Sequence, residues 1–327
     1  MFNNILDNER LNFLNTKRFK KNKVCYLVIS GSNSHGTNTE TSDLDLRGIA
    51  LHSQGEITTG KYNTKTYISP KEDTKVYYLN QIKDNLINCN VEFLELFGVR
   101  ESEIILINKE GRMLRDNIYT FIGKNALEKS FGGFACKETR KARKIMTKYK
   151  KLSKDERYEE ISRGINRAIF KMAEDKKWLT NNIKVHVGNC SEDTLVDVNV
   201  RGCSLVELRK LLGQMSNVIK DYQEPNYENE DKDMEKAFKH LMTATRIYMM
   251  GYDILMNKGV ITYREKENEV LLNIRNGEYS NEKVFEILDF YREKFENALN
   301  YSNLPEQADM ESIDKLINKI NEMSLQM

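Results

Sequence analysis

The chain of 327 residues has few of the residues that mark disorder, disulfide frameworks or zinc sites. It contains only 3 prolines, which argues against a disordered or linker-rich protein. Its 5 cysteines are scattered without a Cys-x-x-Cys pair, and only 4 histidines accompany them. His186 and Cys190 are close in sequence, but no second pair of ligands follows them. We therefore expect reduced thiols, no structural zinc and no zinc deaminase chemistry.

The sequence also lacks an excess of either charge and any long apolar run. With 51 Lys and Arg against 49 Asp and Glu, the net charge is +2. This balance excludes a globally basic nucleic-acid-coating protein, although not a local basic patch. No segment approaches the ~20 apolar residues of a membrane span, and the first residues lack a signal-peptide pattern. We expect a cytoplasmic protein with no membrane partner, long enough for two domains or one elaborated domain.

The apolar pattern changes character at about residue 80. Before it, compact apolar runs predict strands, and a loop or hairpin separates the second from the third. An amphipathic helix is predicted over 3–20, strands over 24–29, 44–51 and 76–79, and the loop over 53–72. The chain therefore begins with a small α/β region.

After residue 80, helical periodicity dominates. The clearest helices are predicted over 80–97, 109–129, 134–151, 156–179, 204–220, 233–257, 281–301 and 311–324. Two alternating segments, 183–187 and 194–200, predict a hairpin around Gly188-Asn189. The expected fold is α+β, with a small mixed-sheet domain over 1–108 and a larger, mostly helical domain over 109–327 that contains a short hairpin near 183–200.

One segment of the N-terminal region combines features that bear on chemistry. A buried strand ends in Gly31-Ser32, and Asp43 and Asp45 alternate on the next predicted strand. Residues i and i+2 share one face of a strand, so these carboxylates are expected roughly 7 Å apart at Cα. Such a pair can bind Mg²⁺, and a glycine turn supplies N–H groups for phosphate. Each feature alone is weak, but together they indicate a phosphoryl-transfer site.

This arrangement resembles the nucleotidyltransferases of the DNA polymerase β superfamily. Their signature is Gly-Ser at the end of the first strand, Asp-x-Asp on the second, and a third carboxylate on a later strand. Residues 34–48 are similar to a bacterial and phage branch that includes the RNA-ligase-associated nucleotidyltransferases. That branch reads Gly-Ser, two residues, Tyr-Gly-Thr, then Ser-Asp-x-Asp-x-Arg-Gly. His35 stands here where the aromatic residue is usual.

Looser similarities to the same branch extend to about residue 300. The third carboxylate matches Asp73, and the adjacent Glu72 is expected to face the opposite side of the strand. The remaining similar segments are 90–97, with Val91 in place of proline, 131–135, 239–246, with Thr243 in place of a second histidine, and 271–278. The expected catalytic domain is therefore a polymerase β-like palm.

The resemblance implies a transferase that moves a nucleoside monophosphate from an NTP, such as ATP, to an acceptor hydroxyl and releases pyrophosphate. Asp43 and Asp45 would hold two Mg²⁺ or Mn²⁺ ions, and Asp73 would bind the ion that activates the acceptor. Gly31 and Ser32 would bind the β- and γ-phosphates.

Three basic residues have two interpretations each. Arg47, next to the predicted metal strand, either neutralises the triphosphate or forms a structural ion pair. Lys239 and Arg246 are seven residues apart on one helix, where they either hold the triphosphate or carry scattered surface charge.

The acceptor is expected to be an RNA end, such as that of a tRNA, in repair or modification. Residues 137–157 hold ten basic and three acidic residues. Lys137, Lys141, Lys144 and Lys148 share one helical face, which either contacts an RNA backbone or is simply solvated. The alternatives are a protein or small-molecule hydroxyl as acceptor, as in antitoxin-like relatives, and a non-catalytic nucleotide-binding relative.

We expect charge reversal of Lys141 and Lys144 to weaken RNA binding and to reduce its dependence on salt. Fewer phosphates would be neutralised, so fewer counterions would be released on binding. Titration of labelled RNA at several salt concentrations measures both effects. Unchanged binding would make this helical face a solvated exterior.

Overall fold

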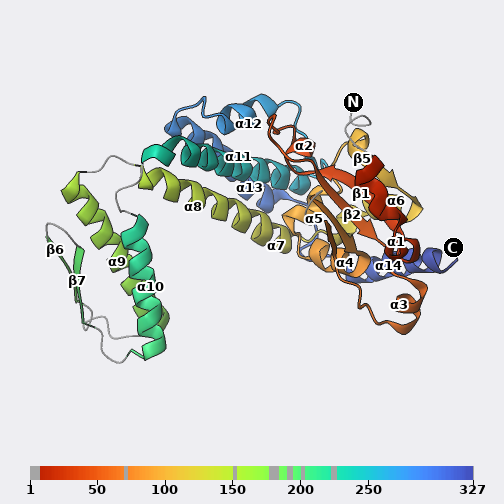
Figure 1. Ribbon diagram of the computed structural model, residues 1–327, viewed down its shortest axis with the longest axis horizontal. Coiled ribbons are helices and arrows are strands. Elements are labelled where there is room, and N and C mark those ends of the chain that lie inside the picture. Colours follow the sequence, from red (N-terminus) through yellow and green to blue (C-terminus); the bar gives the residue numbers. More distant parts are fainter. Residues whose placement is uncertain are drawn as a thin grey trace. The chain divides into compact units, whose positions relative to one another are not determined.

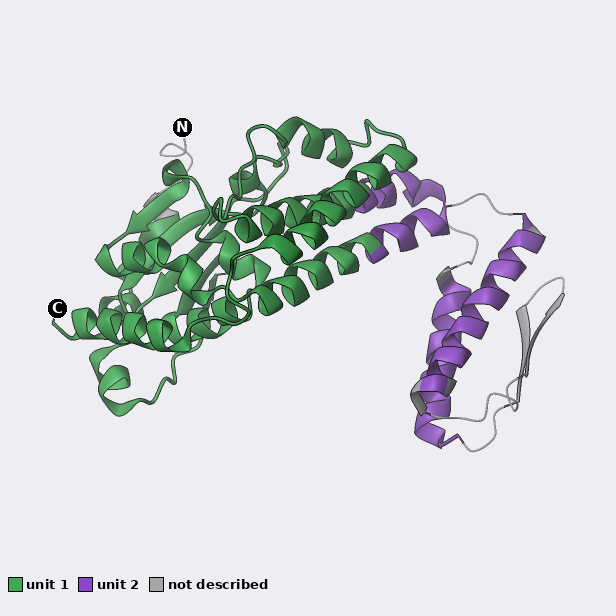
Figure 2. Cartoon of the chain, turned by 180° about the vertical axis from the view of Figure 1, so that it is seen from behind, with its two compact units in different colours: residues 1–139, 238–327 green, residues 140–237 purple. Residues whose placement is uncertain are grey.

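The computed structural model describes residues 8–69, 73–149, 153–176, 184–189, 194–199, 203–221 and 227–326. The chain forms two compact units, one from residues 1–139 with 238–327 and the other from residues 140–237 (Figure 2). This division differs from the one predicted after residue 108. Segments on both sides of the second unit belong with the N-terminal sheet, so the first unit is discontinuous in sequence.

The first unit contains a five-stranded mixed sheet in the order β3-β4-β2-β1-β5, of which β1, β2 and β5 are labelled in Figure 1. β1 is antiparallel to β2 and β5, β2 is parallel to β4, and β3 is antiparallel to β4. Every residue of β1 is buried, as its apolar sequence predicts for a central strand. The strands are β1 (Val24–Ser30), β2 (Asp45–Ala50), β3 (Tyr67–Ser69), β4 (Thr74–Tyr78) and β5 (Ile104–Ile107).

The prediction of a small mixed sheet combined with many helices is confirmed. The strands expected over 24–29, 44–51 and 76–79 are β1, β2 and β4, with ends moved by one or two residues. The short edge strands β3 and β5 were not predicted. Each has only three or four residues, too few to establish an alternating pattern.

Short helices connect the strands, and two predicted long helices are broken. The one expected over 80–97 divides at Cys89, whose φ is +48°, and Asn90 caps the second part. The one expected over 109–129 divides before Gly123, where the chain packs against residues 305–308. The elements are η2 (Asn8–Asn15), α1 (Lys17–Lys21), α2 (Gly31–His35), α3 (Gln54–Thr59), α4 (Leu79–Ile87), α5 (Val91–Glu95), η3 (Glu101–Glu103), α6 (Lys109–Asp116), η4 (Ile118–Phe121) and α7 (Lys124–Leu127).

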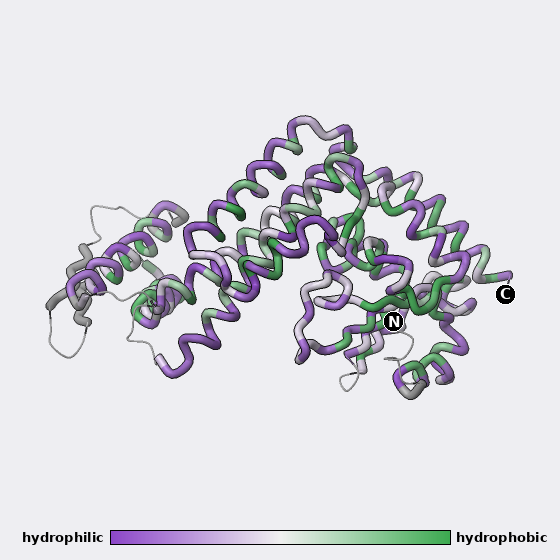
Figure 3. The backbone as a smooth tube through the Cα atoms, turned by 90° about the horizontal axis from the view of Figure 1, so that it is seen from above, coloured by the Kyte–Doolittle hydropathy of each residue, from purple (hydrophilic) through white to green (hydrophobic). Residues whose placement is uncertain are grey.

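The remaining predicted helices are confirmed, with ends within three residues of those expected. Along the helices, hydrophobic residues recur at intervals of three or four and are separated by hydrophilic ones, as in amphipathic helices (Figure 3). They are α8 (Gly133–Lys148), α9 (Lys154–Lys176), α10 (Leu205–Asp221), α11 (Glu230–Leu255), α13 (Asn281–Tyr301) and α14 (Met310–Leu325). The π-helix η5 (Glu128–Gly132), the 3-10 helix η7 (Tyr227–Asn229) and α12 (Asn268–Arg275) complete the set.

The second unit contains the predicted hairpin and a helix pair with its own core. β6 (Lys184–Asn189) and β7 (Thr194–Asn199) are antiparallel, and Gly188 and Asn189 lie within β6 rather than in the turn. Residues 190–193, including Cys190, lie outside the described residues. Ile161, Ile165 and Ile169 of α9 recur every four residues and are buried in a cluster with residues of α10. Among the described helices, none is long and apolar enough to cross a membrane.

The start of α6 lies directly against β1, and this contact requires a glycine. A Cβ atom added to Gly111 would lie 2.2 Å from the carbonyl oxygen of Cys25. The same oxygen accepts a 3.0 Å hydrogen bond from the N–H of Asn108, which fixes the position of the helix. The close approach of α6 to the sheet therefore depends on Gly111.

We expect Gly111→Ala to destabilise the protein by about 1–3 kcal/mol, because α6 must move away from β1. Gly55→Ala in α3 is the matched control, since a Cβ atom there meets nothing within 4 Å. That change is expected to be neutral, or to stabilise by about 0.5–1 kcal/mol through loss of backbone entropy. Denaturant unfolding of both variants measures the difference, and equal effects would contradict the packing described.

Candidate functional site

Two aspartates from neighbouring parallel strands meet at one end of the sheet. Leu46 pairs with Thr74 in the β2–β4 register, and the Leu46 N–H donates to the carbonyl of Asp73 at 3.1 Å. Asp45 and Asp73 therefore lie side by side, and their carboxyl groups share a hydrogen bond. Asp73 has a φ of +41°, an uncommon conformation for a residue other than glycine. This backbone conformation is of the kind found at functional sites.

The pKa values of the two carboxyl groups are shifted in opposite directions. Burial, followed by the hydrogen bond with Asp73, raises the pKa of Asp45 to about 6. The same hydrogen bond is the main cause that lowers the pKa of Asp73. Without a cation the pair is therefore expected to hold one proton below about pH 6 and none well above it. Once both groups are ionised, a divalent cation would offset their charge.

Arg47 binds both carboxylates. One guanidinium nitrogen lies 2.7 Å from Oδ1 of Asp45, and the other lies 3.3 Å from Oδ1 and 2.6 Å from the carbonyl of Asp73. The Arg47 side chain is 9% exposed, and its Nε lies 4.0 Å from Glu92. Of the two interpretations of Arg47, the structure contains the ion pair. Arg47 offsets the repulsion between the aspartates and fixes their positions.

Gly31 brings the end of β1 against the same carboxylates. Ser30 pairs with Asp45 in the antiparallel register, and Gly31 follows with a φ of +69°. A Cβ atom on Gly31 would lie 2.2 Å from Oδ2 of Asp45. Only glycine fits here, both for its conformation and for this close approach. Ser32 is the next residue of α2, so the structure brings Gly31, Ser32, Asp45 and Asp73 together.

Asp43 is placed differently from the expectation. β2 begins at Asp45, so Asp43 lies in the preceding segment instead of on the same strand face. Its side chain is exposed, and its carbonyl accepts a 2.9 Å hydrogen bond from Asn33 of α2. In the part of the chain that the structure describes, no group of three or more His, Cys, Asp and Glu side chains is arranged to hold a metal. Glu72 lies outside the described residues.

The Asp45–Asp73 pair alone fits one magnesium ion. Mg²⁺ commonly takes one or two protein carboxylates and completes its coordination with water and substrate phosphate oxygens. Both aspartates offer oxygen ligands, and their two negative charges share the single positive charge of Arg47. The expected set of three carboxylates is not assembled in this structure.

A buried charge network lies behind the site. Glu95 of α5 is bound by Arg246 of α11 at 2.5 Å, and His35 of α2 lies 3.5 Å from it. Burial raises the pKa of Glu95, but the neighbouring Arg246 and His35 outweigh it, and the pKa falls to about 2. Arg246 is thus a buried partner of Glu95, neither a scattered surface charge nor a residue beside Asp45. Lys239, on the same helix, is exposed.

The C-terminal segment holds the chain that follows α2. Asn268 donates to the carbonyl of Gly36 at 3.2 Å, and Arg275 donates to the carbonyl of Thr37. Gly36 has a φ of +68°, and a Cβ atom there would collide with Tyr263. Sequence reasoning missed these contacts, because their partners are distant in sequence. The similarity of residues 271–278 to a family motif was the one available signal.

The basic face of α8 is largely exposed. Lys137, Lys141 and Lys144 are on the solvent side, opposite the buried Ala142. Lys148 differs, since its ammonium group lies 3.0 Å from Asp233 of α11. Lys137 belongs to the first unit, and Lys141, Lys144 and Lys148 belong to the second.

Comparison with protein-family models, with curated proteins and with solved structures finds no match to this chain. The function is therefore inferred from the geometry of the site and from the sequence motifs.

We expect the Asp45 carboxyl to titrate near pH 6 in the metal-free protein, well above an ordinary aspartate. Because its folded-state pKa is raised, its contribution to stability is present below about pH 4 and is lost as the pH rises toward 6. Carbon-13 NMR of the aspartate carboxyl groups measures the midpoint directly. In Asp73→Asn the midpoint should fall, since the like-charged neighbour is lost. An unchanged midpoint would show that the two carboxyl groups do not interact.

Proposed function

We propose that the protein is a Mg²⁺-dependent nucleotidyltransferase that moves a nucleoside monophosphate from an NTP to an acceptor hydroxyl. The observation that carries this proposal is the contact between the Asp45 and Asp73 carboxyl groups beside Gly31. One guanidinium group serves both carboxylates, so the ionised pair keeps a net negative charge that a divalent cation would bind. Their position next to a glycine turn, which can approach phosphates closely, favours phosphoryl transfer over other uses of a cation.

Each residue has a distinct part in the proposed reaction. Asp45 and Asp73 bind Mg²⁺ in their ionised forms, and Arg47 keeps them in place. The bound ion would draw charge from the phosphate oxygens and acidify the acceptor hydroxyl. The backbone N–H groups and hydroxyl at Gly31-Ser32 face the β- and γ-phosphates of the NTP. Asp43, two residues before Asp45, is exposed and lies outside this pair.

An RNA end is the favoured acceptor. Lys137, Lys141 and Lys144 form an exposed basic face on α8, which suits a phosphate backbone. Lys148 of the same helix lies 3.0 Å from Asp233. Acceptor hydroxyls on proteins or small molecules use the same chemistry, so they are alternative outcomes of one experiment.

We expect the wild-type protein with Mg²⁺ and α-labelled NTPs to label cellular RNA, and Asp45→Asn to lose more than ~100-fold of this activity. The substitution removes a ligand charge, and the variant should keep its fold. Asp84→Asn, on the exposed face of α4, is the matched control and should remain active. Normal turnover by Asp45→Asn would contradict the metal assignment. Label in protein would identify the antitoxin-like alternative.

A second readout needs no acceptor. Adding Mg²⁺ to the wild-type protein should lower the titration midpoint of Asp45, because the ion binds only the ionised carboxyl groups. Absence of label together with a lowered midpoint would indicate a non-catalytic relative that still binds the ion. Absence of both effects would reject the proposed function.

A further inference from the structure

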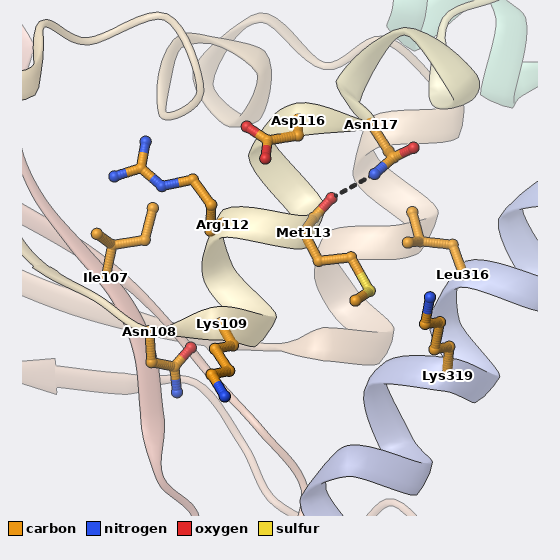
Figure 4. A pocket seen from close by; sticks show the side chains of 9 residues that line it. All are labelled: Ile107, Asn108, Lys109, Arg112, Met113, Asp116, Asn117, Leu316 and Lys319. Carbon is orange, nitrogen blue, oxygen red and sulfur yellow. Dashed lines mark hydrogen bonds between the residues drawn. The ribbon is translucent and has the colours of Figure 1, made fainter.

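A cleft of about 810 Å³ lies between α6 and α14, away from the candidate site (Figure 4). α6 begins beside Cys25, near the start of β1, whereas Asp45 pairs with Ser30 at the other end of that strand. None of the residues that form the carboxylate site lines this cleft. It is therefore a separate place on the first unit.

Two lysines of the cleft have no counter-charge. Lys109 of α6 and Lys319 of α14 both line it, and neither forms an ion pair within the described ranges. Arg112 also lines the cleft, but it is bound to Glu101 at 2.9 Å. The single acidic residue of the lining, Asp116, lies at the opposite end of α6 from Lys109. Two uncompensated ammonium groups on one concave surface favour an anionic ligand.

The lining also offers an amide acceptor. Asn108 accepts the 3.0 Å hydrogen bond of Gly111 through Oδ1, and its Nδ2 is buried without a partner among the described residues. Asn117 donates through Nδ2 to the carbonyl of Met113 at 2.9 Å, which leaves its Oδ1 available (Figure 4). The buried Nδ2 of Asn108 lies out of reach of a ligand in the cleft, so the Oδ1 of Asn117 is the amide acceptor that accompanies the lysines.

Apolar side chains complete the cleft. Met113 from α6 and Leu316 from α14 line it together with the polar groups (Figure 4). The volume is within the range of small-ligand sites, roughly 300–1,000 Å³. A ligand that fits this lining has negative charge for the lysines and a ring that packs on the apolar side chains. The edge of that ring forms hydrogen bonds with the amide.

We infer that this cleft binds a mononucleotide. Lys109 and Lys319 neutralise its phosphates, and its base packs on Met113 and Leu316. The amide of Asn117 faces the polar edge of the base. This site is independent of the proposed transfer reaction, so it would bind nucleotide without Mg²⁺.

The test uses the full chain carrying Asp45→Asn and Asp73→Asn, in EDTA, so that the candidate catalytic site is disabled. Calorimetric titration with the four NTPs and with adenosine is compared with and without Lys109→Ala and Lys319→Ala. We expect one nucleotide per chain, weaker binding at high salt, and a loss of tenfold or more in affinity when both lysines are removed. Adenosine, which has no phosphate, should bind much more weakly.

Lys283→Ala with Lys315→Ala is the matched control, since it removes the same charge from lysines paired with Glu286 and Glu311 outside the cleft. This control should bind nucleotide like its parent. The inference is overturned if none of the four NTPs binds, if removal of Lys109 and Lys319 has no effect, or if adenosine binds as tightly as ATP. It is also overturned if the two lysines are needed only for an RNA oligomer. Thermal unfolding of each variant verifies that the fold is retained.

Discussion

The contact between the Asp45 and Asp73 carboxyl groups is the constraint on which the rest of the candidate site depends. Two ionised carboxylates about 4 Å apart repel by roughly 4 kcal/mol at the effective dielectric of a protein surface. Arg47, which contacts both groups, offsets this repulsion. The parallel register of β2 and β4 places the two residues side by side. The glycine at position 31 follows from the same constraint, because the Asp45 carboxyl occupies the space of its side chain.

Contacts between the N-terminal and the C-terminal parts of the chain hold α2 and the turn after it in place beside the sheet. α2 and the turn after it are held by Glu95 and Arg246 through His35, and by Asn268 and Arg275 through backbone carbonyls. These partners lie up to 238 residues from the turn in sequence. Such contacts fix a loop that would otherwise be exposed and free to move. They also account for the discontinuous first unit, because the helices that hold the turn come after the second unit.

Strong local patterns made parts of this structure predictable. Local sequence alone predicts the apolar run 24–29, the glycine that ends it and the periodic helices. Their positions were predicted to within a few residues. The helix breaks at Cys89 and Gly123 were not predicted. The first is caused by the left-handed conformation of Cys89, and the second by tertiary contacts near Gly123. Spacing placed Asp43 and Asp45 on one strand, but the strand begins later, and the partner of Asp45 comes from another strand. Arg246 and Arg275 could be recognised as polar residues on helices, while their buried partners depend on the fold.

The two helices that lead into and out of the second unit are joined where the first unit ends. Glu138 of α8 and His240 of α11 are 2.6 Å apart, just before residue 140 and just after residue 237. The second unit is thus an insertion whose entry and exit are neighbours, a geometry that tolerates exchange of the inserted part. A shorter connection from residue 139 to residue 238 would therefore leave the contacts within the first unit in place, so this unit can be tested for folding without the second.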